Sequence, residues 1–285
     1  MLIAQISDPH VSTPDSDNDR LLRTPSHLER AVAHLNAHGP RPDITLVTGD
    51  LVERGGLDEY RRLRTFLDRL EMPFLVIPGN HDARGTLRQA FADHAYLPTE
   101  GEFLHYVVEG WPVRLVGLDT VVPGSPGGAQ CPARLAWLDA RLAEAPDRPT
   151  LIFMHHPPFV TGIAAMDKMG LDGQRGFADV LRRHPQVERV VCGHVHRPIT
   201  RRLAGTVVMT CPSTAHQIAL ALAPVNRLGV VMEPPTCLMH AWLGPEHGLV
   251  THESVIGNRY PAFVVQQDGA WLDDPKPPPG FHPAG

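Results

Sequence analysis

Short apolar runs rich in β-branched residues alternate with segments of helical periodicity along the first 210 residues. Such runs, only four to six residues long, are typical of buried strands. Strand–helix alternation favours an α/β layered domain, in which helices cover a largely parallel or mixed sheet. The predicted strands are residues 2–6, 44–48, 74–77, 113–118, 150–154, 188–192 and 206–210.

Three helices are predicted between these strands. Ser26 and Glu29 have the spacing of a capping box and predict the start of the first helix, with Gly39 just past its end. Apolar residues at spacing three to four over residues 60–70 indicate a second helix. Pro132 suits the first position of a third helix, because the proline nitrogen carries no hydrogen to donate.

The composition is that of an ordinary globular protein, with 42% hydrophobic and 20% charged residues among 285. A formal net charge of −5 argues against a nucleic-acid polymer as partner, since such binding favours a basic face. We find no run of 18 apolar residues and no signal-like segment, so we expect a cytoplasmic protein without membrane contact. The four cysteines have no C-x-x-C spacing and are interpreted as free thiols.

The alternating pattern stops near residue 212. Proline-rich segments follow, and no further long helix is predicted. We therefore expect a catalytic domain over residues 1–212. Residues 213–285 would form a small β-rich extension that covers the site, mediates oligomerisation, or does both.

Five short segments place polar side chains directly after predicted strands. In open α/β sheets the loops at the carboxyl ends of strands converge, so these side chains are expected to lie together. Imidazole, carboxylate and amide ligands suit two divalent or trivalent ions of iron, manganese, cobalt or zinc. The segments are Asp8-Pro9-His10, Gly49-Asp50, Gly79-Asn80-His81-Asp82, His155-His156-Pro157-Pro158 and Gly193-His194-Val195-His196.

In type and order these segments resemble the signature of the calcineurin-like metallophosphoesterases, over residues 1 to about 215. Within that family the chain is most similar to the bacterial class III cyclic-nucleotide phosphodiesterases and the related glycerophosphodiesterases. The resemblance implies a four-layer αββα sandwich. The stretches that carry the closer similarity are Ile6-Ser7-Asp8, Ile77-Pro78-Gly79-Asn80-His81-Asp82, Phe153-Met154-His155-His156-Pro157-Pro158 and Cys192-Gly193-His194.

The resemblance also implies a role for each site residue. His81 would stand above two metals and contact the phosphoryl group or protonate the leaving oxygen, and Asp82 would orient its imidazole. Asn80 would contact substrate as well as metal. One metal would be held by Asp8, His10 and His196 and the other by Asn80, His155 and His194, with Asp50 bridging both.

The implied activity is hydrolysis of small phosphodiesters, such as a 3′,5′-cyclic nucleotide or a glycerophosphodiester, by a hydroxide that bridges the two metals. A phosphomonoesterase or a phosphonate monoester hydrolase is the alternative enzyme. A metal-binding interaction scaffold is the alternative without catalysis. We also expect a homo-oligomer.

Four further residues near these segments bear on the predicted function. His156 is expected to support the site without binding metal. His216 lines the substrate pocket or lies on the surface. Arg54, four residues after Asp50, either contacts phosphate, which would favour monoesters, or is a surface residue of a turn. Purple acid phosphatases carry a tyrosine where this chain has Glu53, so a tyrosinate-bound ferric site is not expected.

Overall fold

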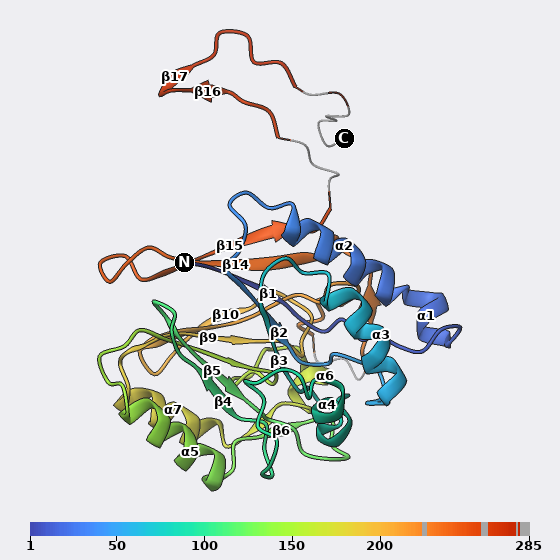
Figure 1. Cartoon of the computed structure of the whole chain (residues 1–285), viewed down its shortest axis with the longest axis vertical. Coiled ribbons are helices and arrows are strands. Elements are labelled where there is room, and N and C mark those ends of the chain that lie inside the picture. Colours follow the sequence, from blue (N-terminus) through green and yellow to red (C-terminus); the bar gives the residue numbers. More distant parts are fainter. Residues whose placement is uncertain (224–226, 258–261, 278, 280–285) are drawn as a thin grey trace.

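The computed structural model describes residues 1–223, 227–257, 262–277 and 279, and it has two large sheets packed face to face (Figure 1). Three neighbouring strands of the first sheet run parallel to one another. The two strands from the C-terminal part of the chain add to one side of these three as antiparallel neighbours. In spatial order this sheet consists of β15 (Leu249–Val255), β14 (Thr236–Trp242), β1 (Leu2–Ile6), β2 (Ile44–Thr48) and β3 (Phe74–Ile77).

The second sheet has a parallel centre and one antiparallel strand at each edge. Its order is β10 (Thr200–Leu203), β11 (Thr206–Thr210), β9 (Val187–Cys192), β7 (Thr150–Met154), β5 (Arg114–Leu118) and β4 (Tyr106–Val108). Three small hairpins or strand pairs lie outside the sheets: β6 (Gly128–Ala129) with β8 (Leu171–Asp172), β12 (Gln217–Ile218) with β13 (Val230–Val231), and β16 (Gln266–Gln267) with β17 (Ala270–Trp271).

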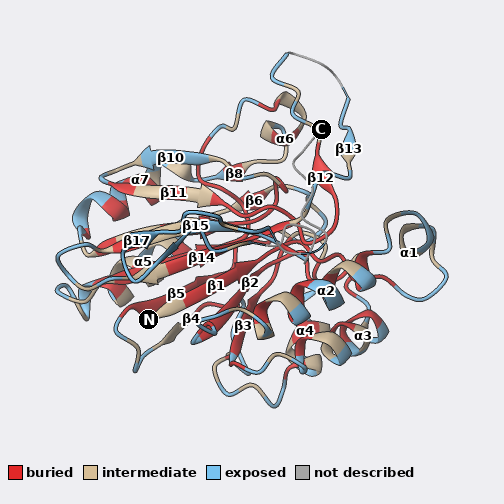
Figure 2. Cartoon of the chain, turned by 90° about the horizontal axis from the view of Figure 1, so that it is seen from above, coloured by how far each residue is buried: buried red, intermediate tan, exposed pale blue. Residues whose placement is uncertain are grey.

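Helices cover the outer face of each sheet, which gives the four layers of the predicted sandwich (Figure 1). Buried residues of β1, β2 and β3 pack with α2 and α3, and those of β5, β7 and β9 pack with α5 and α7. Figure 2 shows the central strands buried and the outer helix faces exposed. The helices are α1 (Asp17–Leu22), α2 (Thr24–Asn36), α3 (Leu57–Leu67), α4 (Arg84–Ala90), α5 (Pro132–Ala143), α6 (Ala164–Asp167) and α7 (Gln174–Arg183).

All seven strands predicted from the sequence are present. Five have the predicted bounds, β5 begins one residue later than predicted, and β9 begins one residue earlier. The residues of β1, β2, β3, β5 and β7 are almost all buried on both faces, as expected for strands between a helix layer and a second sheet, whereas buried and partly buried residues alternate along β11. Pro132 does begin α5, and α3 covers the second predicted helix but ends at Leu67.

The prediction for the ends of α2 was wrong. The helix begins at Thr24, so Ser26 and Glu29 lie inside it rather than capping it. Pro25 in the first turn explains the earlier start, because its fixed φ and missing N–H suit that position. The helix ends at Asn36, and its C-cap is Ala37, whose amide donates to the Ala33 carbonyl, so Gly39 lies two residues beyond the C-cap.

The C-terminal segment contributes to the first sheet. β14 pairs antiparallel with β1, and β15 pairs with β14, so residues 236–255 are continuous with the strands that carry the first site segments. The hairpin β16–β17 lies on an arm that projects from the body in Figure 1. The division at residue 212 stays a prediction. None of the described helices is long and apolar enough to cross a membrane.

Candidate metal centre

The candidate ligands meet at the carboxyl ends of β1, β2, β3, β7 and β9. Main-chain hydrogen bonds hold the loops together there: the Asp8 amide donates to the Gly49 carbonyl at 3.1 Å, and the His10 amide to the Asp50 carbonyl at 3.0 Å. Several of these loop residues have a left-handed backbone, which side chains other than glycine rarely adopt. They are Asp8, His10, Asp50, His194 and His196, with φ between 43° and 72°.

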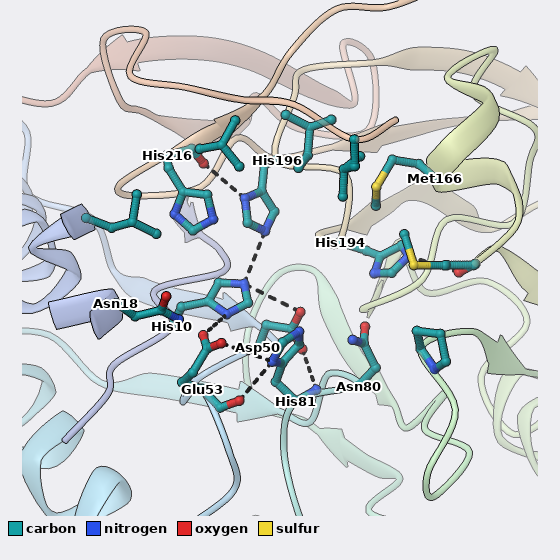
Figure 3. A pocket seen from close by; sticks show the side chains of 16 residues that line it. His10, Asn18, Asp50, Glu53, Asn80, His81, Met166, His194, His196 and His216 are labelled. Atoms are coloured by element: carbon teal, nitrogen blue, oxygen red, sulfur yellow. Dashed lines mark hydrogen bonds and ion pairs between the residues drawn. The ribbon is translucent and has the colours of Figure 1, made fainter. Parts of the chain in front are cut away.

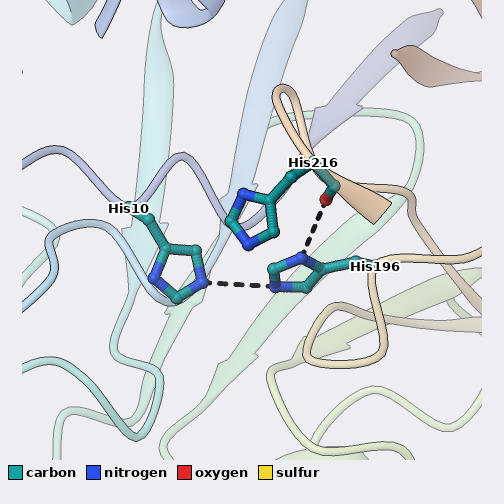
Figure 4. A group of neighbouring side chains, drawn as sticks. All are labelled: His10, His196 and His216. Atoms are coloured by element: carbon teal, nitrogen blue, oxygen red, sulfur yellow. Dashed lines mark hydrogen bonds between the residues drawn. The ribbon is translucent and has the colours of Figure 1, made fainter. Parts of the chain in front are cut away.

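A first group of ligand atoms centres on two imidazoles (Figures 3 and 4). Nε2 of His10 lies 3.2 Å from Nε2 of His196. The Asp8 carboxylate is 3.4 Å from Nε2 of His196, and the Asp50 carboxylate is 3.6 Å from Nε2 of His10. These four side chains, predicted to share one metal, thus present their donor atoms to one small volume.

A second group lies on the other side of Asp50. Nε2 of His155 is 3.3 Å from an Asp50 carboxylate oxygen and 3.2 Å from Oδ1 of Asn80. The ring of His194 lies 5.1 Å from the ring of His155. Its Nε2 donates to the Met169 carbonyl at 2.9 Å, which leaves Nδ1 as the nitrogen for a metal. Asp50 therefore stands between the two groups, where a bridging ligand is required.

The outer ring nitrogens of the histidines are also engaged. Nδ1 of His155 donates to the Thr48 carbonyl at 2.8 Å, and Nδ1 of His196 to the His216 carbonyl at 3.0 Å. Nδ1 of His10 donates to the Glu53 carboxylate at 3.1 Å. Each partner keeps the proton on the outer nitrogen and turns the inner lone pair into the site, as for metal-bound histidines. Lone pairs facing each other repel unless a cation lies between them, so the donor set fits metal ions.

The pKa values of the buried carboxylates and of one buried imidazole also indicate a site for cations. Burial raises the pKa of Asp8 and Asp50, but nearby imidazoles, His196 and His155 respectively, outweigh it and lower both pKa values. Burial opposes protonation of His155, but Asp50 and Asp8 outweigh it and raise the pKa to about 9. In the metal-free protein a proton on His155 therefore takes the place of a cation beside two buried carboxylates.

His81 lies at the open side of this centre. Its amide donates to the Asp50 carboxylate at 2.9 Å, and its Nδ1 donates to the Glu53 carbonyl at 2.8 Å. This leaves Nε2 for the cavity, and the ring lies edge-on to that of His10 at 4.7 Å. Burial works against protonation, but Asp50 and the Glu53 carbonyl overcome it and raise the pKa of His81.

Asp82 does not orient the His81 imidazole as expected. Its carboxylate accepts hydrogen bonds from the amides of Gly79 and Leu51 and from the Tyr60 hydroxyl, at 2.8, 3.0 and 2.8 Å. The carboxylate turns back under its own loop because these three donors lie there. Asp82 thus joins the loops after β2 and β3, and the contact with the His81 ring is made by Glu53.

The structure shows where His156 and His216 lie relative to the candidate ligands. His156 is fully buried, with Nδ1 2.7 Å from the Thr120 hydroxyl and Nε2 3.2 Å from the Pro126 carbonyl. Its ring packs 4.4 Å from that of His194, and both nitrogens have partners, which suits a supporting position. The ring of His216 lies 4.7 Å from that of His196 (Figure 4), and its buried Nδ1 has no hydrogen-bond partner in the part of the chain that the structure describes.

A cavity of about 300 Å³ opens over the centre. Arg54 does not line it and lies instead in a neighbouring polar cavity beside Glu53 and Glu59. Sequence reasoning missed Glu53 and Asn18 as site residues, although Glu53 follows Asp50 by only three positions. The residues that line the cavity over the centre are His10, Asn18, Leu22, Asp50, Glu53, Asn80, His81, Pro126, Met166, Met169, His194, His196, His216, Ile218, Leu228 and Val230.

Known proteins share both the sequence pattern and the fold. The family model for calcineurin-like phosphoesterases matches residues 1–198. A protein from Arcobacter nitrofigilis, named a probable glycerophosphodiester phosphodiesterase (GpdQ), is 36% identical over 258 residues, 90% of this chain and 94% of that protein. The 3′,5′-cyclic adenosine monophosphate phosphodiesterase CpdA of Pseudomonas aeruginosa is 31% identical over 220 residues, 77% of this chain and 78% of that protein. The crystal structure of a dimetal phosphatase from Danio rerio has the same fold, with a TM-score of 0.59 at 15% identity over 90% of this chain and 99% of that one.

Proposed function

Because the chain belongs to the calcineurin-like phosphoesterase family, we propose that it is a phosphodiesterase that hydrolyses small phosphodiesters at a two-metal centre. The observation that carries the proposal is the position of Asp50. Its carboxylate lies between two groups of ligand atoms, 3.6 Å from Nε2 of His10 and 3.3 Å from Nε2 of His155. Relatives named for phosphodiester hydrolysis match most of the chain and support the same activity.

Seven residues would hold the metals. Asp8, His10 and His196 form one set, Asn80, His155 and His194 form the other, and Asp50 serves both. When bound, such ions lower the pKa of a shared water and neutralise charge that builds on phosphoryl oxygens. Iron, manganese, cobalt and zinc all suit this mixture of imidazole, carboxylate and amide donors.

The chain itself supplies a proton donor and binding groups. His81 keeps one proton on Nδ1, held by the Glu53 carbonyl, and presents Nε2 to the cavity. When the imidazole is protonated, which the raised pKa of His81 favours, Nε2 also carries a proton and can donate it to a phosphoryl oxygen, or to the oxygen that leaves when its bond to phosphorus breaks. His216 lines the same cavity and offers a second contact to substrate.

The charges at the cavity favour diesters over monoesters. A diester carries one negative charge at neutral pH and a monoester up to two. Among the described residues that line the cavity there is no lysine or arginine, whereas the Glu53 carboxylate is one of the lining groups. The monoesterase alternative depended on Arg54, which lies in the neighbouring cavity. Glycerophosphodiesters and 3′,5′-cyclic nucleotides are the two candidate substrates, as the names of the relatives suggest.

Two further features belong to this proposal. The protein acts in the cytoplasm, and it assembles as a homo-oligomer through its C-terminal segment. The projecting arm with β16 and β17 supports the second point, because Trp271 on it is 75% exposed and offers an apolar contact.

The test is a comparison of rates on manganese-reconstituted protein. The substrates are bis(p-nitrophenyl) phosphate, p-nitrophenyl phosphate, 3′,5′-cyclic AMP and glycerophosphoethanolamine. We expect diester turnover that is lost in Asn80→Ala and retained in His252→Ala, a control at an exposed histidine of β15. A preference for the monoester would reassign the protein as a phosphatase, and metal retention without turnover would favour the scaffold.

A further inference from the structure

The cavity over the metal centre has two chemically different walls. In Figure 3, Asn18 and Glu53 lie on one side, and Met166 lies with His194 on the other. The Glu53 side carries carboxylate, amide and imidazole groups, with Leu22, one helical turn after Asn18 on α1, as an apolar residue of the lining. The opposite wall is built from apolar residues: Pro126, Met166, Met169, Ile218, Leu228 and Val230.

This apolar wall is attached directly to the metal-ligand segment. Met166 and Ile218 are almost fully buried and form a small cluster with Ile163 and Val195. Val195 lies between His194 and His196 in the chain, so the base of the wall packs against the H-x-H segment. The Met169 carbonyl accepts the hydrogen bond from Nε2 of His194. The position of the wall relative to the reacting phosphorus is therefore set by the fold.

The upper part of the wall is exposed in the free protein. Leu228 is 47% exposed and Val230 is 52% exposed, and both line the cavity. Half-exposed apolar side chains beside a metal centre gain free energy when an apolar group covers them. A hydroxyl-rich group such as glycerol would gain less there, because it would lose hydrogen bonds to water without finding partners on this wall.

We propose that this wall is a subsite for an apolar substituent, alkyl or aryl, on a monoanionic phosphodiester. This inference rests on the proposed phosphodiesterase function and adds the chemical class of one substituent. The other substituent faces the polar wall with Asn18 and Glu53. Of the two candidate classes, a glycerophosphodiester with an apolar second substituent matches this arrangement, because both ester oxygens of a 3′,5′-cyclic nucleotide belong to one ring.

The experiment measures binding of methyl alkyl phosphates with methyl, butyl and hexyl chains. These ligands have the same single charge and differ only in apolar length. Their inhibition constants are determined in competition with bis(p-nitrophenyl) phosphate on the manganese-loaded enzyme, and their dissociation constants by calorimetry. We expect binding about fourfold tighter for each added methylene until the wall is covered.

Variants locate the effect. Leu228→Ser combined with Val230→Ser changes two exposed positions and is expected to flatten the dependence on chain length. Leu243→Ser, at an equally exposed leucine outside the cavity lining, should leave that dependence unchanged. The double variant should bind as much metal as the wild type, because neither residue is a candidate ligand, and elemental analysis of the loaded proteins checks this.

Three outcomes would overturn the subsite. Turnover of diesters with no dependence on chain length would leave the proposed function intact and refute the apolar wall. A length dependence that survives in the double variant would place the apolar subsite elsewhere. Dissociation of an oligomer in the double variant, with an unchanged dependence on chain length, would show that a second copy covers the wall. Absence of turnover on every diester would instead refute the proposed function, and calorimetry would still report on the wall.

Discussion

The carboxylate of Glu53 lies 3.1 Å from Nδ1 of His10, a candidate metal ligand, and accepts a hydrogen bond from it. The main-chain carbonyl of the same residue accepts a hydrogen bond from Nδ1 of His81 at 2.8 Å. One residue therefore fixes the tautomers of a ligand and of the candidate proton donor. Burial alone would raise the pKa of Glu53. Hydrogen bonds from His10 and Asn18 outweigh this effect and lower the pKa of Glu53.

Replacing Glu53 with glutamine should weaken metal binding. Glutamine keeps the size of the side chain but removes the charge that makes the His10 imidazole a stronger donor. Loss of such a partner typically costs 10- to 100-fold in metal affinity. The affinity can be measured by competition with a chelator. Glu71→Gln, at an exposed surface pair with Arg41, is the control and should change nothing. Equal affinity in both variants would mean that His10 is oriented without Glu53.

Replacing Gly79 with alanine should disable the centre. A Cβ there would lie 2.2 Å from the Asp50 carboxylate and 2.3 Å from the Asp50 amide nitrogen, so the bridging residue or its loop has to move. We expect loss of bound metal, measured by elemental analysis, and at least 100-fold lower turnover. Gly85→Ala is the matched control, because its Cβ would meet no atom within 4 Å. Full metal content in Gly79→Ala would show that the two loops can separate without harm.

The ion pair between partly buried Arg84 and fully buried Asp119 should fix the loop that carries Asn80. Arg84 begins α4, four residues after Asn80, and its guanidinium donates to both Asp119 carboxylate oxygens, at 2.6 and 3.0 Å. Asp119→Asn is expected to lower the free energy of unfolding by about 3 kcal/mol, because the guanidinium loses its charge partner. It should also weaken metal retention.

The control for this pair is at the other end of the same strand. Arg114, at the start of β5, pairs with Glu109 and Glu144. Arg114→Gln should lower the urea-unfolding free energy while the metal content stays at wild-type level. If both variants lose metal in proportion to their loss of unfolding free energy, Asp119 stabilises the fold and does not specifically position the Asn80 loop.

The metal-free protein should lose stability as the pH falls below about 6.5. His240 is fully buried between the sheets, with ring nitrogens 2.8 Å from the Thr251 hydroxyl and 3.2 Å from the Gln5 side chain. Burial lowers its pKa to about 3, so between about 6.5 and 3 the unfolded chain binds a proton that the folded chain does not. Each pH unit in this window then costs about 1.4 kcal/mol.

Urea unfolding at pH 7.5 and 5.0 measures this loss. His240→Gln should reduce the difference between the two pH values by about 2 kcal/mol, since glutamine does not titrate. His252→Gln, at an exposed position, should leave the difference as in the wild type. A pH dependence that is the same in all three proteins would assign the acid sensitivity to other groups, such as His105, whose pKa burial also lowers to about 4.

The strands and ligand segments were predictable because each depends on local pattern. A buried strand such as residues 150–154 has a short apolar run, and a ligand such as His155 follows it directly. The partners of side chains were not predictable in the same way. Asp82 stands next to His81 in the sequence, yet its carboxylate binds Tyr60, which comes from another helix. The start of α2 followed from Pro25, whereas the capping-box spacing nearby was coincidental.

The place of β14 could not be read from the sequence either. Four of its seven residues pair with strand β1, which lies at the other end of the sequence; His240, for example, pairs with Ile3. No local signal specifies such a partner. The polar contacts of His240 with Gln5 and Thr251 become visible only when the three strands β1, β14 and β15 are side by side.

This pairing has a consequence for how the protein is made. All seven candidate ligands have been synthesised once residue 196 is complete, but β1, which leads to Asp8 and His10, still lacks a neighbour on one side. That edge stays open until residues 236–242 leave the ribosome and pair with it. During this interval the nascent chain presents an unpaired apolar strand, a template for wrong pairing with another chain. Translation that stalls between the last ligand and β14 would therefore release a chain that carries every metal-binding group and is prone to aggregate.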